Sequence, residues 1–404
     1  MAFNPVRKMA DNIAAIRIAL DFTGQQLSQT ELETLKKYAG FGGLKAVLFP
    51  PGEITEWAKY GASAADMKLY PQVMELHALL QEKLSAANYK SAIDALKSSS
   101  QTAYYTPDYI PRAIYAVMRE AQILPKRLYE PSAGAGVFIE EAVDAFEGLE
   151  QVNAVEKDIL TGKILTALCS AYPLPIEVQI KKLEETAATE KAQSDLVISN
   201  IPFGKIAVHD PAYSKSGISA KVHTYFFAKG LDKIKDGGIL AYIVTEAFLN
   251  NPFNETARKY LFTSADLLSV AVLPANLMKE NANVEVGMHL ILVQKNDSKE
   301  TLTEAEGQLI DTIEVENSFG KYHLNAWLAD KNELVYADEI IEGTNARGKL
   351  RGWLGKMAIC RILSLRLKNS WLPVLPILTM PNGKPSPLTK RKSSLNNLPF
   401  YRYR

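Results

Sequence analysis

Apolar residues recur with two different spacings along the chain. Within residues 5–100 they follow helical spacing, as at Ile13, Ile16 and Leu20, with an interruption at GFGGLKAVLFPPGE. From about Gln101 onward, short apolar runs alternate with amphipathic stretches. The first region therefore predicts helices alone, and the second predicts strands that alternate with helices.

The apolar runs of the second region have the length of strands. They read RLYEPSA, VNAVE, IEVQI, DLVISNIPF, GILAYIVTEAFL, LLSVAVLP and HLILVQK. Strands and helices in alternation imply parallel strands joined by right-handed crossovers. We therefore expect an α/β fold with a Rossmann-like doubly wound sheet and an N-terminal helical region. Ligands of such a sheet bind at the carboxyl ends of its strands.

The composition narrows the class of protein. The 404 residues are 47% apolar, which is ample for the core of one large domain with appendages. Cys169 and Cys360 stand far apart without CxxC spacing, so neither a disulfide framework nor a zinc site is supported. The sequence shows no signal-peptide pattern and no run of 18 charge-free apolar residues. We expect a cytoplasmic protein without a metal site or membrane contact.

Positive charge is concentrated at the end of the sequence. The formal net charge is +1, yet residues 343–404 hold 13 Lys and Arg and no Asp or Glu. One interpretation is a basic arm that follows nucleic-acid phosphates and stacks bases on Trp353, Trp371 and Tyr401. The interpretation that we favour is a translated frameshift, because the acidic residues disappear abruptly. In both cases we expect the tail to be poorly ordered.

A glycine loop and an acidic residue indicate a nucleoside cofactor. The stretch LYEPSAGAGVFIEEAV places Gly134 and Gly136 between a strand and a helix, where backbone can approach a ligand closely. Ile139 stands where a dinucleotide fingerprint needs a third glycine, which disfavours NAD. Glu156 ends the next strand and can accept hydrogen bonds from two ribose hydroxyls. S-adenosylmethionine fits this description, and the alternative is a tight turn beside a solvated glutamate.

The stretch SDLVISNIPFG suits chemistry on an exocyclic amine. Methylation of such an amine needs acceptors for both of its N–H hydrogens, in line with a methyl donor. Asn200 offers a side-chain carbonyl, and Ile201 or Pro202 offers a backbone carbonyl. Phe203 offers a face on which an extruded base can stack. The alternative interpretation is a turn that ends a buried strand.

Together these motifs resemble a known family. EPSAGAG, SNIPFG and TAYYTP look like motifs I, IV and X of the gamma-ordered amino-methyltransferases that modify adenine in DNA, and they stand in the right order. YAGFGGLK, DILTGKIL, HTYFFAKGLD and EVGMHLILVQK further resemble the methylase portion of methylase-helicase proteins of bacterial mobile elements and phages, over residues 12–295. The resemblance implies a class I S-adenosylmethionine-dependent methyltransferase of the restriction-modification kind.

The resemblance also implies roles for individual residues. Asn200, Pro202 and Phe203 would hold the target base, although Ile201 replaces the first proline of the usual fourth motif. Glu184 would hold the adenine of the cofactor, with Glu185 as an equal candidate. The remaining cofactor-binding residues implied by the motifs are Tyr105, Thr106, Pro107, Glu130, Gly134, Gly136 and Glu156.

The expected organisation follows from these boundaries. We predict a helical N-terminal region (1–100), a methyltransferase catalytic domain (101–300), an extension (301–345) and the basic tail (346–404). The predicted activity is an adenine-specific, site-specific DNA-methyltransferase that flips its target base, with DNA as partner and a helicase or specificity module supplied by a longer homologue. Two alternatives stay open: methylation of RNA or of a protein glutamine, and a catalytically silent DNA-binding antirestriction component.

Overall fold

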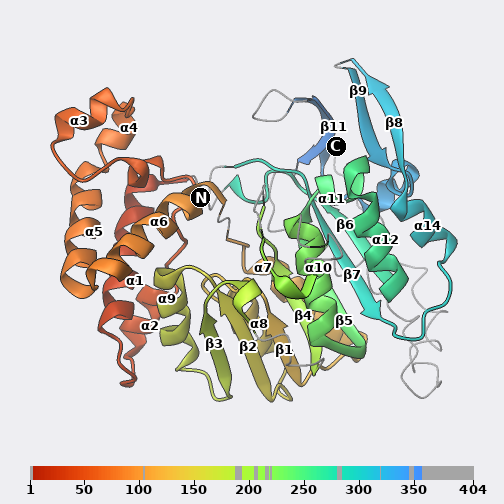
Figure 1. Ribbon diagram of the computed structural model, residues 1–404, viewed down its shortest axis with the longest axis horizontal. Coiled ribbons are helices and arrows are strands. Elements are labelled where there is room, and N and C mark those ends of the chain that lie inside the picture. The colour runs from red at the N-terminus through yellow and green to blue at the C-terminus, as the bar shows by residue number, and fades with distance from the viewer. Residues whose placement is uncertain are drawn as a thin grey trace, which may run out of the picture.

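The computed structural model places a central sheet between layers of helices (Figure 1). The described residues are 3–102, 105–186, 193–203, 208–213, 218, 221–279, 284–318, 320–344 and 350–356.

The central sheet has seven strands in the order β3-β2-β1-β4-β5-β7-β6. Its strands are β1 (Arg127–Glu130), β2 (Gln151–Glu156), β3 (Ile176–Ile180), β4 (Ser194–Asn200), β5 (Ile234–Thr245), β6 (Ala265–Leu273) and β7 (Met288–Lys295). Each coincides with one of the apolar runs, so the predicted α/β fold with a Rossmann-like sheet is confirmed.

The direction of one strand differs from the prediction. Strands β1 to β5 pair in parallel, but β7 lies antiparallel between β5 and β6. The expectation of parallel strands throughout is therefore wrong for β7. Its apolar composition is that of any strand covered on both faces, so the sequence carries no sign of its direction.

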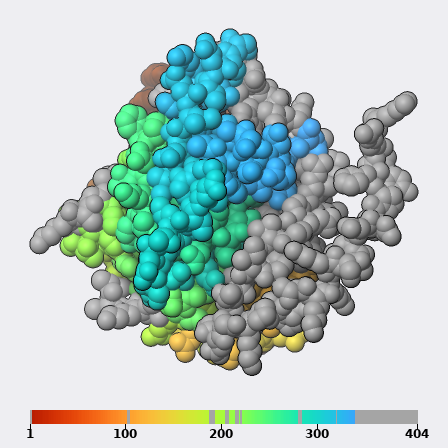
Figure 2. Space-filling view, turned by 90° about the vertical axis from the view of Figure 1, so that its right-hand side faces the viewer, coloured from red at the N-terminus to blue at the C-terminus, as the bar shows by residue number. Residues whose placement is uncertain are grey.

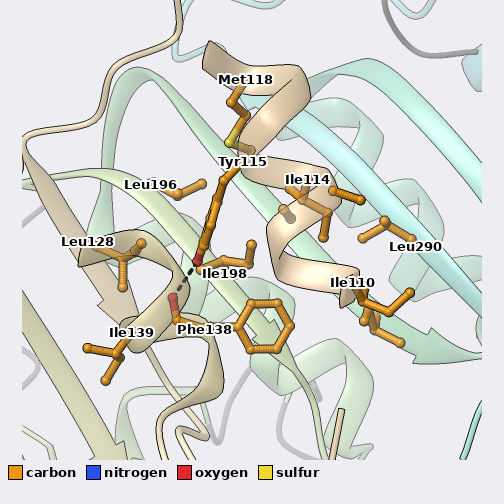
Figure 3. Packing of buried hydrophobic residues seen from close by; sticks show 14 of the residues in the cluster. Ile110, Ile114, Tyr115, Met118, Leu128, Phe138, Ile139, Leu196, Ile198 and Leu290 are labelled. Atoms are coloured by element: carbon orange, nitrogen blue, oxygen red, sulfur yellow. Dashed lines mark hydrogen bonds between the residues drawn. The ribbon is translucent and has the colours of Figure 1, made fainter. Parts of the chain in front are cut away.

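Helices cover both faces of the sheet. On one face, α7 (Tyr109–Glu120) and α8 (Val137–Ala145) share a core with Leu196 and Ile198 of β4. On the other face, α10 (Val222–Lys233) and α12 (Glu255–Ser264) share a core with Val197 of β4, whose side chain points to the opposite face from those of Leu196 and Ile198. Figure 3 shows α7 against the first face, where Tyr115 donates a hydrogen bond to the carbonyl of Phe138 at 2.8 Å.

The N-terminal helices pack beyond the β3 edge of the sheet (Figure 1). They are α1 (Pro5–Asp21), α2 (Gln29–Leu35), α3 (Ile54–Lys59), α4 (Ala64–Met67), α5 (Tyr70–Lys83) and α6 (Ala86–Thr102). Their apolar side chains form one cluster together with Leu160 and Ile164 of α9 (Ile159–Cys169), the helix that connects β2 and β3. The first hundred residues and the sheet domain thus share a core.

Smaller elements follow the sheet. They are α14 (Glu304–Ile310), the hairpin β8 (Thr312–Asn317) and β9 (Gly320–Asn325), and the hairpin β10 (Glu339–Thr344) and β11 (Leu350–Lys356). Residues of α14, β8 and β9, in cyan to blue, lie on the face shown in Figure 2. The second hairpin crosses the predicted boundary between residues 345 and 346, and residues 357–404 lie outside the described residues. The division into domains stays a prediction.

Within the described ranges, we find no helix with the length and apolar character needed to cross a membrane. The same residues contain no group of three or more His, Cys, Asp or Glu side chains placed to hold a metal ion.

Candidate active site

A cavity of about 300 Å³ opens at the carboxyl ends of β1, β2 and β4. Its lining includes these residues predicted for the site: Tyr105, Thr106, Glu130, Gly134, Glu156, Asn200, Pro202 and Phe203. They come from segments up to about a hundred residues apart, and the sheet brings them together because its parallel strands end at one edge. Of the described residues predicted for the site, Pro107, Gly136 and Glu184 lie outside this lining.

A second cavity of about 190 Å³ adjoins the first. Ser132, Lys157, Lys182 and Pro202 line both cavities. The second cavity also has apolar walls and one carboxylate, which come from Val155, Leu183, Val222, Phe226 and Glu184. Glu184 therefore lies after the carboxyl end of β3 and lines the second cavity, together with the apolar side chains just named.

Glu156 is fixed by the backbone of the glycine loop. Its Oε2 accepts a hydrogen bond from the amide of Gly134, and its Oε1 accepts one from the amide of Asp158, both at 2.8 Å. Burial, with the nearby Asp158 carboxylate, raises the pKa of Glu156 to about 7. A carboxylate oxygen has more than one acceptor site, so a pair of hydroxyls can still bind to it.

The pKa of Glu156 predicts how stability depends on pH. The pKa of Glu156 is 4.5 in the unfolded chain and about 7 in the folded chain. The contribution of this carboxyl to the stability of the fold is therefore fully present below pH 4.5 and is lost as pH rises through 7. Glu156→Gln removes that loss. We expect the variant to gain up to about 3 kcal/mol relative to the wild type between pH 4.5 and 7, measured by denaturant unfolding. Parallel curves for the two proteins would contradict the prediction.

Glu130 lines the same cavity and is 1% exposed. Burial, and next the Glu156 carboxylate, hold its pKa well above the usual range. Its Oε2 has no hydrogen-bond partner among the residues that the structure describes. A buried carboxyl oxygen without a donor is costly, so this atom fits a ligand that brings a hydrogen-bond donor, such as the ammonium group of S-adenosylmethionine.

Asn200 ends β4 at the rim of the cavity. Its Nδ2 donates a hydrogen bond to Oγ1 of Thr106 at 3.0 Å, which turns the carbonyl oxygen of the amide away from Thr106. The next residue is tied to the sheet, because the amide of Ile201 donates to the carbonyl of Ile243 at 3.1 Å. The turn that carries the predicted amine acceptors is therefore held from both sides.

Phe203 is less open than the sequence suggests. The ring borders the cavity, yet the residue is only 7% exposed and belongs to the hydrophobic core under α7 and α8. The role of this ring as a stacking face for an extruded base stays a prediction. Pro202, the residue before it, is half-buried and lines both cavities.

Gly136 has a structural reason to be glycine. It caps α8 in the left-handed region with φ 87°, and a Cβ there would come within 2.6 Å of Leu165 Cδ1. Its absent side chain faces Leu165 of the core, and the predicted contact of its backbone with the cofactor stays a prediction. Gly134 differs, because it lines the cavity and a Cβ there would lie 3.2 Å from Cε1 of Tyr105.

Gly136→Val is expected to destabilise the fold. The branched side chain must adopt a positive φ and overlap Leu165, two costs of about 1–3 kcal/mol each. Thermal unfolding should show the loss. The control is Gly148→Val, since a Cβ at Gly148 meets no atom within 4 Å. Equal stability of the two variants would disprove the packing role.

Some residues of the site have no obvious signal in the sequence. Ala95, Ser98 and Ser99 of α6 line the larger cavity, although α6 belongs to the helical region before the sheet. Thr161 of α9 lines it as well. The motif YAGFGGLK hints that the N-terminal region contributes to the site, because its glycines indicate that another segment packs closely against the backbone there. The motif does not reveal which segment that is.

Comparison with known proteins agrees with the motifs. Residues 140–275, about a third of the chain, match the family described as Eco57I restriction-modification methylase. The modification methylase CviBIII of Paramecium bursaria Chlorella virus NC1A is 26% identical over 192 residues, which are 46% of this chain and 48% of the relative. The defense against restriction protein B of Escherichia phage P1 is 28% identical over 204 residues, 50% of this chain and 8% of that protein. The match thus spans less than half the length of either curated relative.

Solved structures with a similar fold include subunits of type I restriction-modification systems. The methyltransferase subunit from Streptococcus thermophilus is 13% identical with a TM-score of 0.46, covering 91% of this chain and 86% of that chain. The EcoKI M protein is 14% identical with a TM-score of 0.42, covering 92% and 89%. The family match and the modification methylase confirm the resemblance to amino-methyltransferases of restriction-modification systems that the sequence motifs indicate, and with it S-adenosylmethionine as the cofactor of such a domain.

Proposed function

We propose that this protein transfers a methyl group from S-adenosylmethionine to the exocyclic amine of adenine in DNA, after the base has been flipped out of the helix. The observation that carries the proposal is the juxtaposition of Asn200, oriented by Thr106, with Glu156 in one cavity. Both side chains line the same space of about 300 Å³, in which Asn200 would accept from the amine and Glu156 from the ribose hydroxyls.

The two adjoining cavities suit the parts of the cofactor. The apolar slot beside Glu184, with Leu183 and Phe226, would take the adenine ring. Glu156 would accept the ribose hydroxyls. Oε2 of Glu130, which has no hydrogen-bond partner among the described residues, would accept from the ammonium group. The cofactor supplies an electrophilic methyl group. The residues of the chain bind it and orient it.

Asn200 and the backbone of the following turn would prepare the amine. The lone pair of an exocyclic amine is delocalised into the ring, so the nitrogen becomes nucleophilic only when its geometry shifts toward tetrahedral. Two carbonyl acceptors, one from the Asn200 side chain and one from the backbone at Ile201 or Pro202, favour that geometry. The proton can leave to water once the nitrogen is cationic, so the site needs no dedicated base.

DNA is proposed as the substrate because the matched family and the chlorella virus relative carry names of restriction-modification and modification methylases. A base inside a duplex cannot reach a cavity at the strand ends, so the target must be extruded. We also propose that the domain works with a helicase or specificity module of the kind that a longer homologue supplies.

The test is a methyl-transfer assay with radiolabelled S-adenosylmethionine and four acceptors side by side: duplex DNA, single-stranded DNA, RNA and a glutamine-containing peptide. Hydrolysis and chromatography of the labelled DNA then separate N6-methyladenine from N4-methylcytosine. We expect label in adenine of DNA, and far slower labelling with Asn200→Ala. Label in RNA, peptide or cytosine would replace the proposed acceptor.

A second candidate function is a restriction-defence role without catalysis. Its support is the likeness to the defense against restriction protein B of phage P1. The two candidates differ in cofactor use. Binding of S-adenosylmethionine in calorimetry together with methyl transfer would exclude the silent alternative.

A further inference from the structure

We propose that residues 38–43, the loop YAGFGG in the connection from α2 to α3, form a positioning element of the cofactor site. This inference rests on the proposed function for the identity of the cofactor. The loop acts by fixing the ring of Tyr105, which lines the cavity. Cofactor binding therefore depends on the N-terminal helical region.

The ring of Tyr105 is enclosed between two glycines. A Cβ at Gly40 would come 2.1 Å from Cε2 of Tyr105, and a Cβ at Gly134 would come 3.2 Å from Cε1. Gly40 has φ 64°, a conformation that L side chains rarely adopt. Gly40 belongs to the N-terminal region and Gly134 to the glycine loop between β1 and α8. Both segments therefore set the position of the Tyr105 ring.

The hydroxyl end of Tyr105 is held as well. Its Oη lies 3.3 Å from Oγ1 of Thr161, and the same Oγ1 lies 2.9 Å from Oη of Tyr38. The rings of Tyr38 and Tyr105 meet edge to face, with centroids 5.9 Å apart. Thr161 lines the cavity from the first turn of α9. The loop thus reaches the site through a shared hydroxyl contact in addition to packing.

The loop itself is fixed to the helices around it. Asn12 of α1 is fully buried; its Nδ2 donates to the carbonyl of Gly40 at 2.7 Å, and its Oδ1 accepts from the amide of Ala39 at 3.0 Å. The amide of Gly43 donates to the carbonyl of Ser100 on α6 at 3.3 Å. Since Asn12 satisfies two adjacent backbone groups, the position of Gly40 follows that of α1.

The test compares two glycines with similar backbone but different surroundings. Gly40 and Gly61 both have positive φ, 64° and 79°, but a Cβ at Gly61 meets no atom within 4 Å. Both alanine variants carry the backbone strain, and only Gly40→Ala displaces Tyr105. Titration calorimetry of the full chain with S-adenosylmethionine should show an affinity loss of about tenfold or more for Gly40→Ala, and little change for Gly61→Ala. Equal affinities would overturn the inference.

Tyr38→Phe covers the case in which Gly40→Ala fails to fold, and a double-mutant cycle adds a second test where it folds. Tyr38→Phe removes only the hydroxyl that contacts Thr161 and should weaken cofactor binding about two- to tenfold without a change in far-UV circular dichroism. In a double-mutant cycle, Gly40→Ala should cost little further affinity in a Tyr105→Ala background, because the ring that it displaces is gone. Unchanged affinity in Tyr38→Phe, or additive losses in the cycle, would contradict the positioning role.

Failure of this inference is distinguishable from failure of the proposed function. If the wild-type chain binds no S-adenosylmethionine, the proposed cofactor is wrong and the inference falls with it. If the wild type binds the cofactor, and Gly40→Ala binds it as well as Gly61→Ala does, only the role of the loop is wrong.

Discussion

Asn200→Ala is expected to lower the single-turnover rate of methylation by about 10²–10³-fold, the loss measured when one polar group that stabilises a transition state is removed. The amide carbonyl would accept an amine hydrogen mainly as the nitrogen becomes tetrahedral, so its removal affects rate more than binding. Cofactor affinity should barely change. Rapid-quench kinetics under saturating DNA and cofactor, with calorimetry in parallel, measures both quantities.

The partner of Asn200 offers a graded control. Thr106→Ala frees the amide to rotate, because it removes the hydroxyl that holds Nδ2 at 3.0 Å, and should give an intermediate loss of rate. Thr106→Ser keeps a hydroxyl at that place and should restore most of the rate. Wild-type rates in Asn200→Ala would show that the stretch NIPF only ends a strand.

Phe203→Ala is expected to lower the free energy of unfolding by about 3 kcal/mol, the lower end of the usual range for this change. The residue is 7% exposed and packs in the core under α7 and α8, but its ring also borders the cavity, so the space that it leaves is partly open. Denaturant unfolding measures the loss. The same variant should capture an extruded base less well.

Two substitutions separate packing from stacking at Phe203. Phe203→Leu keeps an apolar side chain in the core and loses the aromatic face, so it should retain most of the stability and methylate poorly. Phe203→Tyr keeps the face and should methylate well. An adenine opposite an abasic position, which is already unpaired, should narrow the difference between them. If Phe203→Leu methylates at the wild-type rate, the stacking role is wrong.

The strand positions follow closely from the sequence because the central strands of the sheet, such as β5, are buried on both faces and form nearly continuous apolar runs. The run HLILVQK illustrates the limit, since it predicts β7 but contains nothing that fixes its antiparallel direction. That direction depends on which neighbours pair with the strand, a property of the whole sheet. The helical N-terminal pattern likewise shows its amphipathic faces and not the helix, α9, that they cover.

The site is predictable where residues end parallel strands. Glu156 and Asn200 end β2 and β4, and such ends meet at one edge, so both line the same cavity. Gly136 shows what spacing cannot tell, because a glycine motif does not reveal whether the missing Cβ would meet a ligand or Leu165. The contribution of Ser98 and Ser99 depends on packing between distant segments, which leaves no local pattern.

The position of β7 has a consequence for the newly made chain. β7, residues 288–295, is synthesised last of the seven strands, yet it lies between β5 and β6 and pairs with both. While the ribosome is still adding the residues before Met288, β5 has an open edge and β6 has no neighbour in the sheet. Unpaired apolar strands of this kind attach readily to other chains. Until β7 is made, one edge of β5 and the whole of β6 therefore stay open to such contacts, and a chaperone that covers a strand edge would be most useful over that interval.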